Sequence, residues 1–366
     1  VTRVYTPGSL YEEGLLEGDE QSLLAAVVLG FDALGLAVID ASTGKAWAST
    51  HGGADRILRL QDDLLRWQPS ELVMTPKDAG NDQLARLFPL LDATMVSQHN
   101  LSPAKRDERL RTMLNVADLG HLDLDHAPLA ISATGLAADY LATVHRQPDV
   151  PLRDVELVEE QGHLLLDQTT LRNLELTATL AGEYDGSLLS TLNRCRTAMG
   201  RRLLKTWMLH PLSDPTAIQT RHAAVGTLAR SARRLDGMRT SLKGIRDMER
   251  LATQLAYQRS NARDLVATAH ALERMPAVAQ WCKDSQDPLL MHLSEGLEQL
   301  NEMMKTVQHT LNQEAPLGLR DGGLLRPGVD DEVDQLRTVT SEGKAWFSSL
   351  EPVSYTHLTL PTTLVV

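Results

Sequence analysis

Short apolar runs separated by turn signals dominate the first 128 residues of the chain. Such runs predict β-strands, and stretches with an apolar side chain at every third or fourth position predict helices. The predicted strands cover residues 23–29, 36–39, 46–48, 72–74 and 93–96. The predicted helices cover residues 57–65, 82–90 and 103–114, which gives the order βββαβαβα. This order predicts an α/β domain, a mixed sheet with helices, that ends near residue 128.

Beyond this domain the pattern is almost entirely helical. The alanine-rich stretch Leu129–Val144 contains good helix formers. Asp214 and Pro215 mark a helix start, because aspartate is a favoured N-cap and proline suits the first helical position. Asn261 is another N-cap candidate, with Asp264 in the first turn, where a negative charge suits the helix dipole. These signals predict a helical bundle.

A seam of apolar residues runs through the last third of the chain. Its members alternate spacings of three and four: Leu290, Leu293, Leu297, Leu300, Met304, Val307 and Leu311. Three heptads are few for a free coiled coil, so the seam predicts a single bundle helix packed on its neighbours. A further helix is expected over residues 330–350, after the turn at Gly322-Gly323.

Composition agrees with a helical protein and excludes several classes. Aromatic residues make up only 4% of the chain, which suits helix-on-helix packing better than a β-sandwich. No apolar run approaches the roughly 18 residues that cross a bilayer, and the N-terminal residues lack a secretory pattern. Cys195 and Cys282 cannot build a disulfide framework, so a reducing, cytosolic compartment is expected. The net charge of −12 argues against general nucleic-acid binding, which depends on Lys and Arg.

No segment matches a nucleotide-binding motif. A phosphate-binding loop has the pattern G-x-x-x-x-G-K-[ST], in which backbone N–H groups and a lysine surround the phosphates. The pair Gly44-Lys45 is followed by Ala46, and Ile39 stands where the first glycine is required. Gly343-Lys344 is followed by Ala345 inside a predicted helix. We therefore expect no nucleotide-binding residue in this chain.

Metal chemistry is also poorly supported by the sequence. The order βββαβαβα resembles ribonuclease-H-like folds, whose nucleases bind two metal ions through convergent carboxylates. Here the first strand carries no acid, and Asp32 and Asp40 lie beyond the ends of predicted strands. A dense histidine and carboxylate cluster comprises His121, Asp123, Asp125 and His126. Its close spacing matches no zinc-site pattern, so we expect a solvated linker there and assign no catalytic or metal-binding residue.

Five cations gather within twelve residues that contain no acid: Arg194, Arg196, Arg201, Arg202 and Lys205. In the same stretch Met199, Leu203 and Trp207 repeat every four residues, which predicts a buried helix face. Two uses of the cations are open, namely contact with phosphate and pairing with the acid-rich stretch Asp154–Glu160. Pairing is favoured because the chain as a whole is acidic.

Five sequence segments together carry a family resemblance. They are VTRVYTPGSL (Val1–Leu10), LLLDQTTLRNLEL (Leu164–Leu176), GSLLSTLNRCRTAMGRRLLKTWMLHPLSDP (Gly186–Pro215), RDMERLATQLA (Arg246–Ala256) and RDGGLLRPGVDDEVDQLR (Arg320–Arg337). In this order they resemble the MutS family of DNA mismatch-recognition ATPases. The resemblance covers residues 1 to about 351 and rests on several independent motifs.

The resemblance implies a multidomain α+β layout. Residues 1–17 are similar to the linker that follows a mismatch-binding domain, and residues 18–128 to a ribonuclease-H-like connector domain. Residues 129–320 resemble the helical core domain, and residues 321–351 the start of a lever helix toward a DNA-gripping clamp. Residues 352–366 resemble read-through of a cloning or sequencing adapter, so we expect this tail to be non-native.

Some residues within these motifs have expected structural roles. Thr197 is expected to cap a helix, and Gly200 to let another helix approach closely. Asn173 and Glu175 are expected to hold loop N–H groups where the chain joins the bundle. Ala262 replaces a proline that the family usually has, which weakens a helix start but changes no chemistry.

The resemblance also implies a function for the intact protein. That protein would bind mismatched double-stranded DNA, ATP and magnesium, act as a homodimer in the bacterial cytoplasm, and start mismatch repair. This fragment would relay between the ATPase and the DNA clamp and present its connector to a MutL-type partner. It would hold no cofactor and lack the ATPase domain, so we expect it to be inactive alone. The alternatives are a MutS-related helical scaffold without repair activity and a nuclease built on the first domain.

Overall fold

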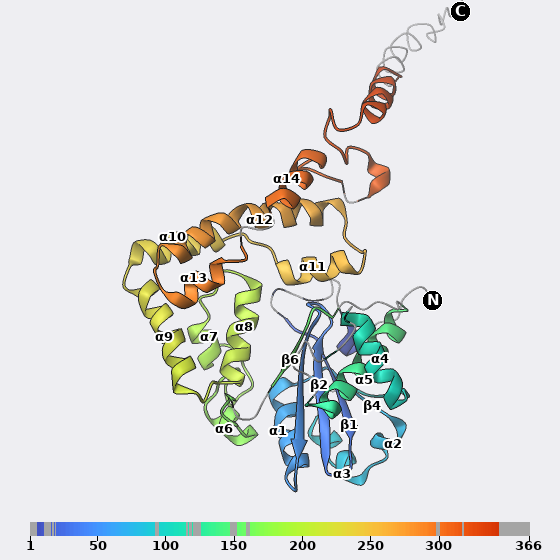
Figure 1. The fold of residues 1–366 in the computed structure, drawn as a ribbon, viewed down its shortest axis with the longest axis vertical. Helices are drawn as coiled ribbons and strands as arrows, with labels where there is room; N and C mark the ends of the chain where they lie inside the picture. Colours follow the sequence, from blue (N-terminus) through green and yellow to red (C-terminus); the bar gives the residue numbers. More distant parts are fainter. Residues whose placement is uncertain are drawn as a thin grey trace, which may run out of the picture. The chain divides into compact units, whose positions relative to one another are not determined.

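A computed structural model gives the fold of the chain (Figure 1). The structure describes residues 6–10, 16, 18, 20–91, 95–114, 116, 119, 126–146, 152–158, 162–297, 301–316 and 318–343. The chain divides into two compact units, residues 1–260 with 270–300 and residues 261–269 with 301–366.

The first unit contains a six-stranded sheet with the spatial order β5-β4-β1-β2-β3-β6. The strands are β1 (Leu23–Leu29), β2 (Ala33–Asp40), β3 (Lys45–Gly52), β4 (Glu71–Met74), β5 (Met95–Gln98) and β6 (Asp154–Leu157). β1, β2 and β3 form an antiparallel meander, whereas β4, β5 and β6 each pair in parallel. All of β1 except its last residue is buried, because helices cover both faces of the sheet.

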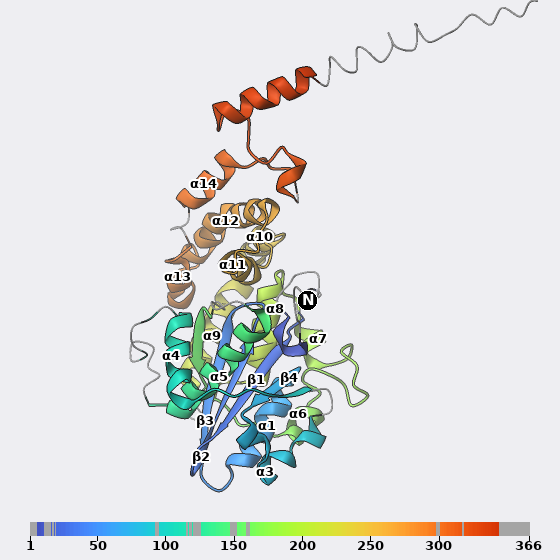
Figure 2. The ribbon, with the colours of Figure 1, turned by 90° about the vertical axis from the view of Figure 1, so that its right-hand side faces the viewer.

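Each face of the sheet has its own hydrophobic core. Helix α1 (Arg56–Trp67) covers one face with Leu60 and Leu64. Helices α4 (Pro103–Leu114) and α5 (Pro128–His145) lie beside one another on the other face (Figures 1 and 2). Two short helices, α2 (Pro76–Ala79) and α3 (Asp82–Ala85), follow β4. The predicted mixed sheet with helices is confirmed.

Helix α5 belongs to the sheet domain, which corrects the boundary expected at residue 128. A Cβ on Gly35 of β2 would lie 2.0 Å from the carbonyl oxygen of Leu129, and a Cβ on Gly135 would lie 2.3 Å from the carbonyl oxygen of Arg106. Backbone therefore packs directly on backbone at both glycines, which only glycine permits. Strand β6, absent from the predicted elements, then completes the sheet, so this domain extends to Leu157.

The chain then becomes helical, as predicted. The helices are α6 (Gln168–Asn173), α7 (Leu188–Leu192), α8 (Ala198–Leu209), α9 (Pro215–Ala229), α10 (Ala232–Leu242), α11 (Met248–Ala256), α12 (Ala262–Lys283), α13 (Pro288–Ser294) and α14 (Asn301–Thr310). The expected caps are confirmed: the Thr197 hydroxyl accepts from the N–H of Gly200, and Asp214 accepts from two N–H groups of α9. Gly200 faces its own cap rather than another helix.

Helices α9, α10, α12 and α13 form a small core of their own. Ala224, Val278, Cys282 and Leu290 are buried together there. Helix α10 crosses α12 closely at Gly237, where an added Cβ would lie 2.2 Å from the ring of Trp281. The described helices of the first unit after β6, α6 to α11 and α13, together with residues 270–283 of α12, are called the helical domain below.

The predicted single helix through Leu290 and Leu311 is wrong. Helix α13 ends at Ser294, residues 295–297 form a turn, and α14 begins at Asn301. Gly296 lies in this turn. A continuous helix would be destabilised there, because glycine within a helix costs about 1 kcal/mol relative to alanine. The two halves of the seam also fall in different compact units.

The second unit contains α14 and a helix over residues 331–343. Within it Asn261 and Asp264 cap each other's backbone as expected, and Nε of Arg263 donates to the carbonyl oxygen of Ala315 at 2.8 Å. The helix expected over residues 330–350 is described only as far as residue 343, and the tail 352–366 lies outside the described residues. Among the described helices of both units, none has the length and apolarity that a membrane crossing requires.

Candidate functional site

A buried ion pair joins helices α8 and α11. Arg202 is only 5% exposed. Its guanidinium donates two hydrogen bonds to the carboxylate of Asp247, with Nη2 2.8 Å from Oδ1. The same Nη2 lies 2.6 Å from Oε2 of Glu249. A bidentate pair of this kind has strict geometry, because both N–H···O bonds must be aligned at once.

The charges of this pair hold one another in their ionised forms. Burial by itself raises the pKa of Asp247, but the hydrogen bonds and charges of Arg202 and Arg250 bring the pKa below its usual value. Burial likewise lowers the pKa of Arg202, and the two carboxylates more than reverse this effect. The pair is therefore charged throughout the physiological pH range, and removing one partner leaves the buried charge of the other only partly compensated.

Arg250 connects this pair to the segment that leads into β1. It is 3% exposed, and its guanidinium donates to the backbone carbonyl oxygens of Gly18, at 3.1 Å, and Glu20. Its Nε lies 3.6 Å from Oδ2 of Asp247. One arginine of α11 thus holds backbone more than 200 residues away in sequence, so the helical domain is fixed to the sheet domain at this point.

A second connection runs through Arg153, just before β6. Its Nε donates to the carbonyl oxygen of Thr43 at 2.9 Å, and its Nη2 lies 4.0 Å from Oε1 of Glu249. We call the set Arg153, Arg202, Asp247, Glu249 and Arg250 the Asp247 junction. It links α8 and α11 to two separate segments of the sheet domain.

The local sequence explains how Asp247 is placed. In the segment Arg246-Asp247-Met248-Glu249-Arg250, Asp247 is the N-cap of α11 and accepts from the N–H of Arg250 at 3.3 Å. An N-cap carboxylate lies at the positive end of its helix, which stabilises the negative charge. The same side chain therefore starts α11 and pairs with α8.

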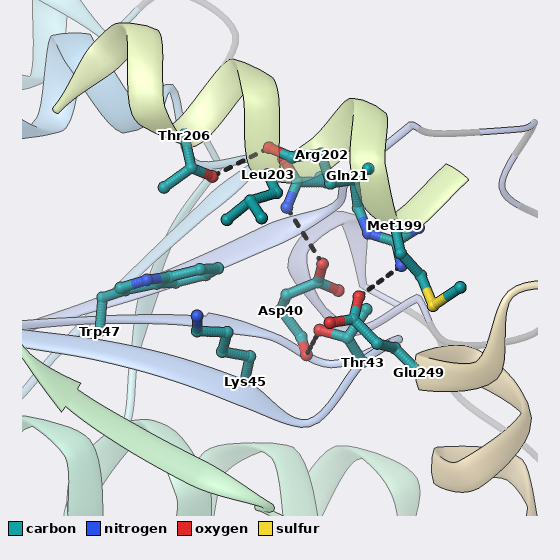
Figure 3. A pocket seen from close by; sticks show the side chains of 11 residues that line it. Gln21, Asp40, Thr43, Lys45, Trp47, Met199, Arg202, Leu203, Thr206 and Glu249 are labelled. Atoms are coloured by element: carbon teal, nitrogen blue, oxygen red, sulfur yellow. Dashed lines mark hydrogen bonds and ion pairs between the residues drawn. The ribbon is translucent and has the colours of Figure 1, made fainter. Parts of the chain in front are cut away.

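A cavity of about 180 Å³ lies beside the junction (Figure 3). It is lined by Gln21, Asp40, Thr43, Lys45, Trp47, Met199, Gly200, Arg202, Leu203, Thr206 and Glu249. Asp40 is fully buried and accepts from the backbone and the hydroxyl of Ser42 and from Gln21. Figure 3 shows these side chains converging from the sheet and from α8. Each charged group of the lining has a partner: Arg202 pairs with Glu249, Lys45 pairs with Glu156, and Asp40 accepts the hydrogen bonds above. This arrangement suits coupling of two domains rather than acid–base catalysis.

Aromatic rings make another contact between α8 and the sheet domain. His210, at the end of α8, stacks on Trp67 with ring centroids 4.5 Å apart, and Trp67 lies 4.7 Å from Trp47. Burial, with the nearby positive charge of Arg66, lowers the pKa of His210 to about 4. His210 is therefore neutral at physiological pH.

The segment before β1 is held from two further sides. The N–H of Gly8 donates to Oε2 of Glu71 at 3.2 Å, and Nε2 of His145 lies 2.8 Å from the carbonyl oxygen of Ser9. The other ring nitrogen of His145 lies 3.3 Å from the hydroxyl of Tyr257, at the end of α11. Burial lowers the pKa of His145, so a neutral ring bridges Ser9 and Tyr257.

The residues that the sequence analysis considered for nucleotides and metals do not form a site together. Lys45 pairs with Glu156 at 3.0 Å, and Asp32 lies in an exposed turn of the sheet domain. Of the histidine and carboxylate cluster, His121, Asp123 and Asp125 lie outside the described residues. His126 belongs to no group of three metal-binding side chains in the described part of the chain.

The structure corrects two expectations for α8. The expected pairing of the five cations with the stretch Asp154–Glu160 is wrong for Arg202, which pairs with Asp247 and Glu249 instead. Leu203 and Trp207 are 46% and 41% exposed, so the apolar stripe of α8 is not a buried face but lines the wall of open cavities.

The expectation that Glu175 holds a loop N–H group near the start of the helical domain is confirmed. Its Oε1 accepts from the N–H of Leu180 at 2.6 Å. The sequence does not predict the role of Arg250, because its acceptors are backbone carbonyl groups that leave no sequence signal.

Comparison with known proteins agrees with the motifs. The family model for MutS domain II matches residues 22–154, and the model for MutS domain III matches residues 169–355. A DNA mismatch repair protein MutS of Synechococcus elongatus is 36% identical over 366 residues, covering 96% of this chain and 41% of the relative. The proteins of the same name from Symbiobacterium thermophilum and Trichormus variabilis are 35% and 34% identical and cover 96% of the chain.

The chain thus spans about two fifths of the length of these relatives. Both family models match in the order in which the sheet and helical domains occur. The domain III model alone covers half of the chain, and the relatives cover nearly all of it. The chain therefore belongs to the MutS family.

Proposed function

We propose that this chain is the connecting part of a MutS-type DNA mismatch repair protein. In this proposal it passes conformational change between a part that grips mismatched DNA and a part that hydrolyses ATP with magnesium. The relatives described above are each named DNA mismatch repair protein, which favours this function over a scaffold without repair activity.

The proposal extends to the partners of the intact protein. It would act as a homodimer in the bacterial cytoplasm, and its sheet domain, the counterpart of the connector, would offer a surface to a MutL-type partner. The match of the sheet domain to MutS domain II supports its assignment as the connector.

The observation that carries the relay is the Asp247 junction. Its buried, bidentate geometry tolerates little sliding, because small shifts would leave Arg202 or Asp247 charged and unpaired. Packed interfaces of this kind move as one body or switch between discrete arrangements. A displacement of α11 would therefore be passed to the segment at Gly18 and Glu20 through Arg250.

A chimaera tests this function. Residues 1–351 would replace the matching segment of the Synechococcus elongatus relative, and the chimaera would be assayed for suppression of mutations in a strain without its own MutS. We expect the chimaera to restore repair. In the purified chimaera, Arg250→Ala is expected to leave basal ATP hydrolysis intact and to reduce the response of ATP turnover to mismatched DNA about tenfold, or ~1.4 kcal/mol.

The control is Arg196→Ala, an exposed arginine of the same domain, which should leave the response unchanged. A normal response to mismatched DNA in the Arg250→Ala chimaera would contradict the relay. Failure of the unmodified chimaera to suppress mutations, despite normal expression, would contradict the repair function itself.

A further inference from the structure

Positive charge is concentrated in one part of this acidic chain. Residues 193–274 carry 16 of the 36 Lys and Arg residues but only six of the 48 Asp and Glu residues. The chain as a whole has a net charge of −12. The rest of the molecule is therefore strongly acidic, and this segment has the opposite sign.

Several of these cations gather on the outer side of α10. Arg233 and Lys243 are exposed and Arg239 is half-buried, whereas Met238 and Leu242 of the same helix pack in the small core beneath. Helix α10 crosses α12 closely at Gly237, which faces the ring of Trp281 (Figure 1). The exposed side chains of α10 thus include much of the positive charge.

Two more arginines extend the surface at its ends. Arg230 is exposed at the end of α9, directly before α10. Arg274 of α12 donates to the backbone carbonyl oxygen of Lys243, which places its guanidinium beside the end of α10. We call Arg230, Arg233, Arg239, Lys243 and Arg274 the α10 basic surface.

The α10 basic surface keeps an excess of positive charge. Asp236 lies on the exposed side of α10, and Glu273 precedes Arg274 but lies 3.6 Å from His270. In the part of the chain that the structure describes, no carboxylate forms an ion pair with any of the five cations. Their charge is therefore available to a ligand.

The surroundings indicate what kind of ligand fits. Between Val225 and Met291, no large apolar side chain is exposed among the described residues. Protein–protein interfaces have an apolar core enriched in aromatic residues, whereas surfaces that bind nucleic acid are polar and positively charged. A row of cations without an apolar anchor suits a phosphate backbone.

We propose that the α10 basic surface binds the phosphate backbone of double-stranded DNA without regard to sequence. The ten steps of the chain from Arg233 to Lys243 span about 15 Å along the helix. Duplex DNA presents one phosphate per ~1.7 Å of its axis, so several phosphates lie within reach of this row. The surface shares no residue with the Asp247 junction, and the proposal is independent of the relay.

Fluorescence anisotropy with a labelled duplex of about 30 bp tests the proposal on the full chain, across roughly 50 to 200 mM salt. The test variant is Arg233→Gln, Arg239→Gln, Lys243→Gln. A matched control, Lys77→Gln, Arg86→Gln, Lys105→Gln, removes three exposed cations from the sheet domain. Circular dichroism melts of both variants establish that each is folded.

The test variant should bind at least about tenfold more weakly at low salt, with a salt slope smaller by about two to three, because phosphate contacts release counterions. The control should change affinity less than about twofold. Homoduplex and G·T heteroduplex should bind equally, since phosphate contacts carry no sequence information. Arg233→Lys with Arg239→Lys should keep the affinity. Equal losses in test and control variants, or no saturable binding by the unmodified chain at about 50 mM salt, would overturn the proposal.

Discussion

Nη2 of Arg202 lies 2.8 Å from Oδ1 of Asp247, the same oxygen that accepts the N–H of Arg250 at the start of α11. One carboxylate therefore both begins a helix and neutralises a buried guanidinium on its neighbour. The stability of the helical domain and its attachment to the sheet domain depend on a shared group, and the two properties should change together on mutation.

Asp247→Asn separates the capping role of this residue from its charge. Asparagine caps a helix as well as aspartate, but it leaves buried Arg202 with Glu249, which is one third exposed, as its negative partner. We expect the free energy of unfolding to fall by about 3–5 kcal/mol. Urea titration monitored by tryptophan fluorescence measures this change.

The matched control is Asp214→Asn, at the exposed N-cap of α9. It makes the same chemical change where no buried arginine depends on it, so the free energy of unfolding should change little. Equal losses for the two variants would show that Asp247 acts only as a cap.

His210 predicts a pH dependence of stability. Its pKa is about 4 in the folded chain, against an ordinary value of about 6.5 when unfolded. As the pH falls below 6.5, the unfolded chain takes up a proton that the folded chain does not. The free energy of unfolding should fall over this window, by about 2 kcal/mol at pH 5, and level off below pH 4 for this group.

His210→Phe keeps an aromatic ring against Trp67 and removes the proton site. The loss of stability between pH 7.5 and pH 5 should therefore shrink by about 2 kcal/mol. The control is His222→Phe, on the exposed side of α9. Its free energy of unfolding should fall between pH 7.5 and pH 5 by as much as that of the unmodified chain. An unchanged pH dependence in His210→Phe would refute the assignment.

Gly237→Ala tests the crossing of α10 and α12. The added Cβ would lie 2.2 Å from the Trp281 ring, so the helices must separate, at a cost of about 1–3 kcal/mol in the free energy of unfolding. Gly226→Ala in α9 adds the same methyl group where the nearest atom is 3.8 Å away, at the end of the Arg230 side chain. The free energy of unfolding of that variant should rise by about 0.5–1 kcal/mol, because alanine has the higher helix propensity. Thermal melts that show the same sign for both variants would contradict this packing.

The chain alone should not bind ATP. Neither Gly-Lys pair, Gly44-Lys45 or Gly343-Lys344, matches the phosphate-loop pattern. Lys45 also forms an ion pair with Glu156. Calorimetric titration with Mg-ATP should give no saturable heat. Binding in the micromolar range would require a nucleotide site without a phosphate-loop motif and would contradict this prediction.

Local signals were sufficient to predict much of the fold. The β1 run from Leu23 to Leu29 and the helix from Pro103 to Leu114 occur where apolar spacing placed them. The caps at Thr197 and Asp214 also follow from neighbouring residues alone. In each case the decisive interaction lies within a few positions in sequence.

Features that depend on tertiary contact were missed. β6 is a four-residue edge strand with acidic residues facing outward, so its sequence lacks an apolar run. The placement of α5 on the sheet depends on Gly35 and Gly135, whose importance appears only when backbone meets backbone. Arg250 holds carbonyl groups 230 and more positions away, which no spacing rule detects.

Pulsed electron–electron spin resonance tests the central claim, that the Asp247 junction fixes the helical domain to the sheet domain. Spin labels would be placed at Lys77→Cys and Thr240→Cys, both exposed, with Cys195→Ser and the buried Cys282 retained. The unmodified junction should give a single narrow distance distribution, and so should the Arg196→Ala control. Arg250→Ala should broaden or shift the distribution, because the backbone at Gly18 and Glu20 loses its hydrogen bonds from the guanidinium. A narrow, unshifted distribution in Arg250→Ala would contradict the claim.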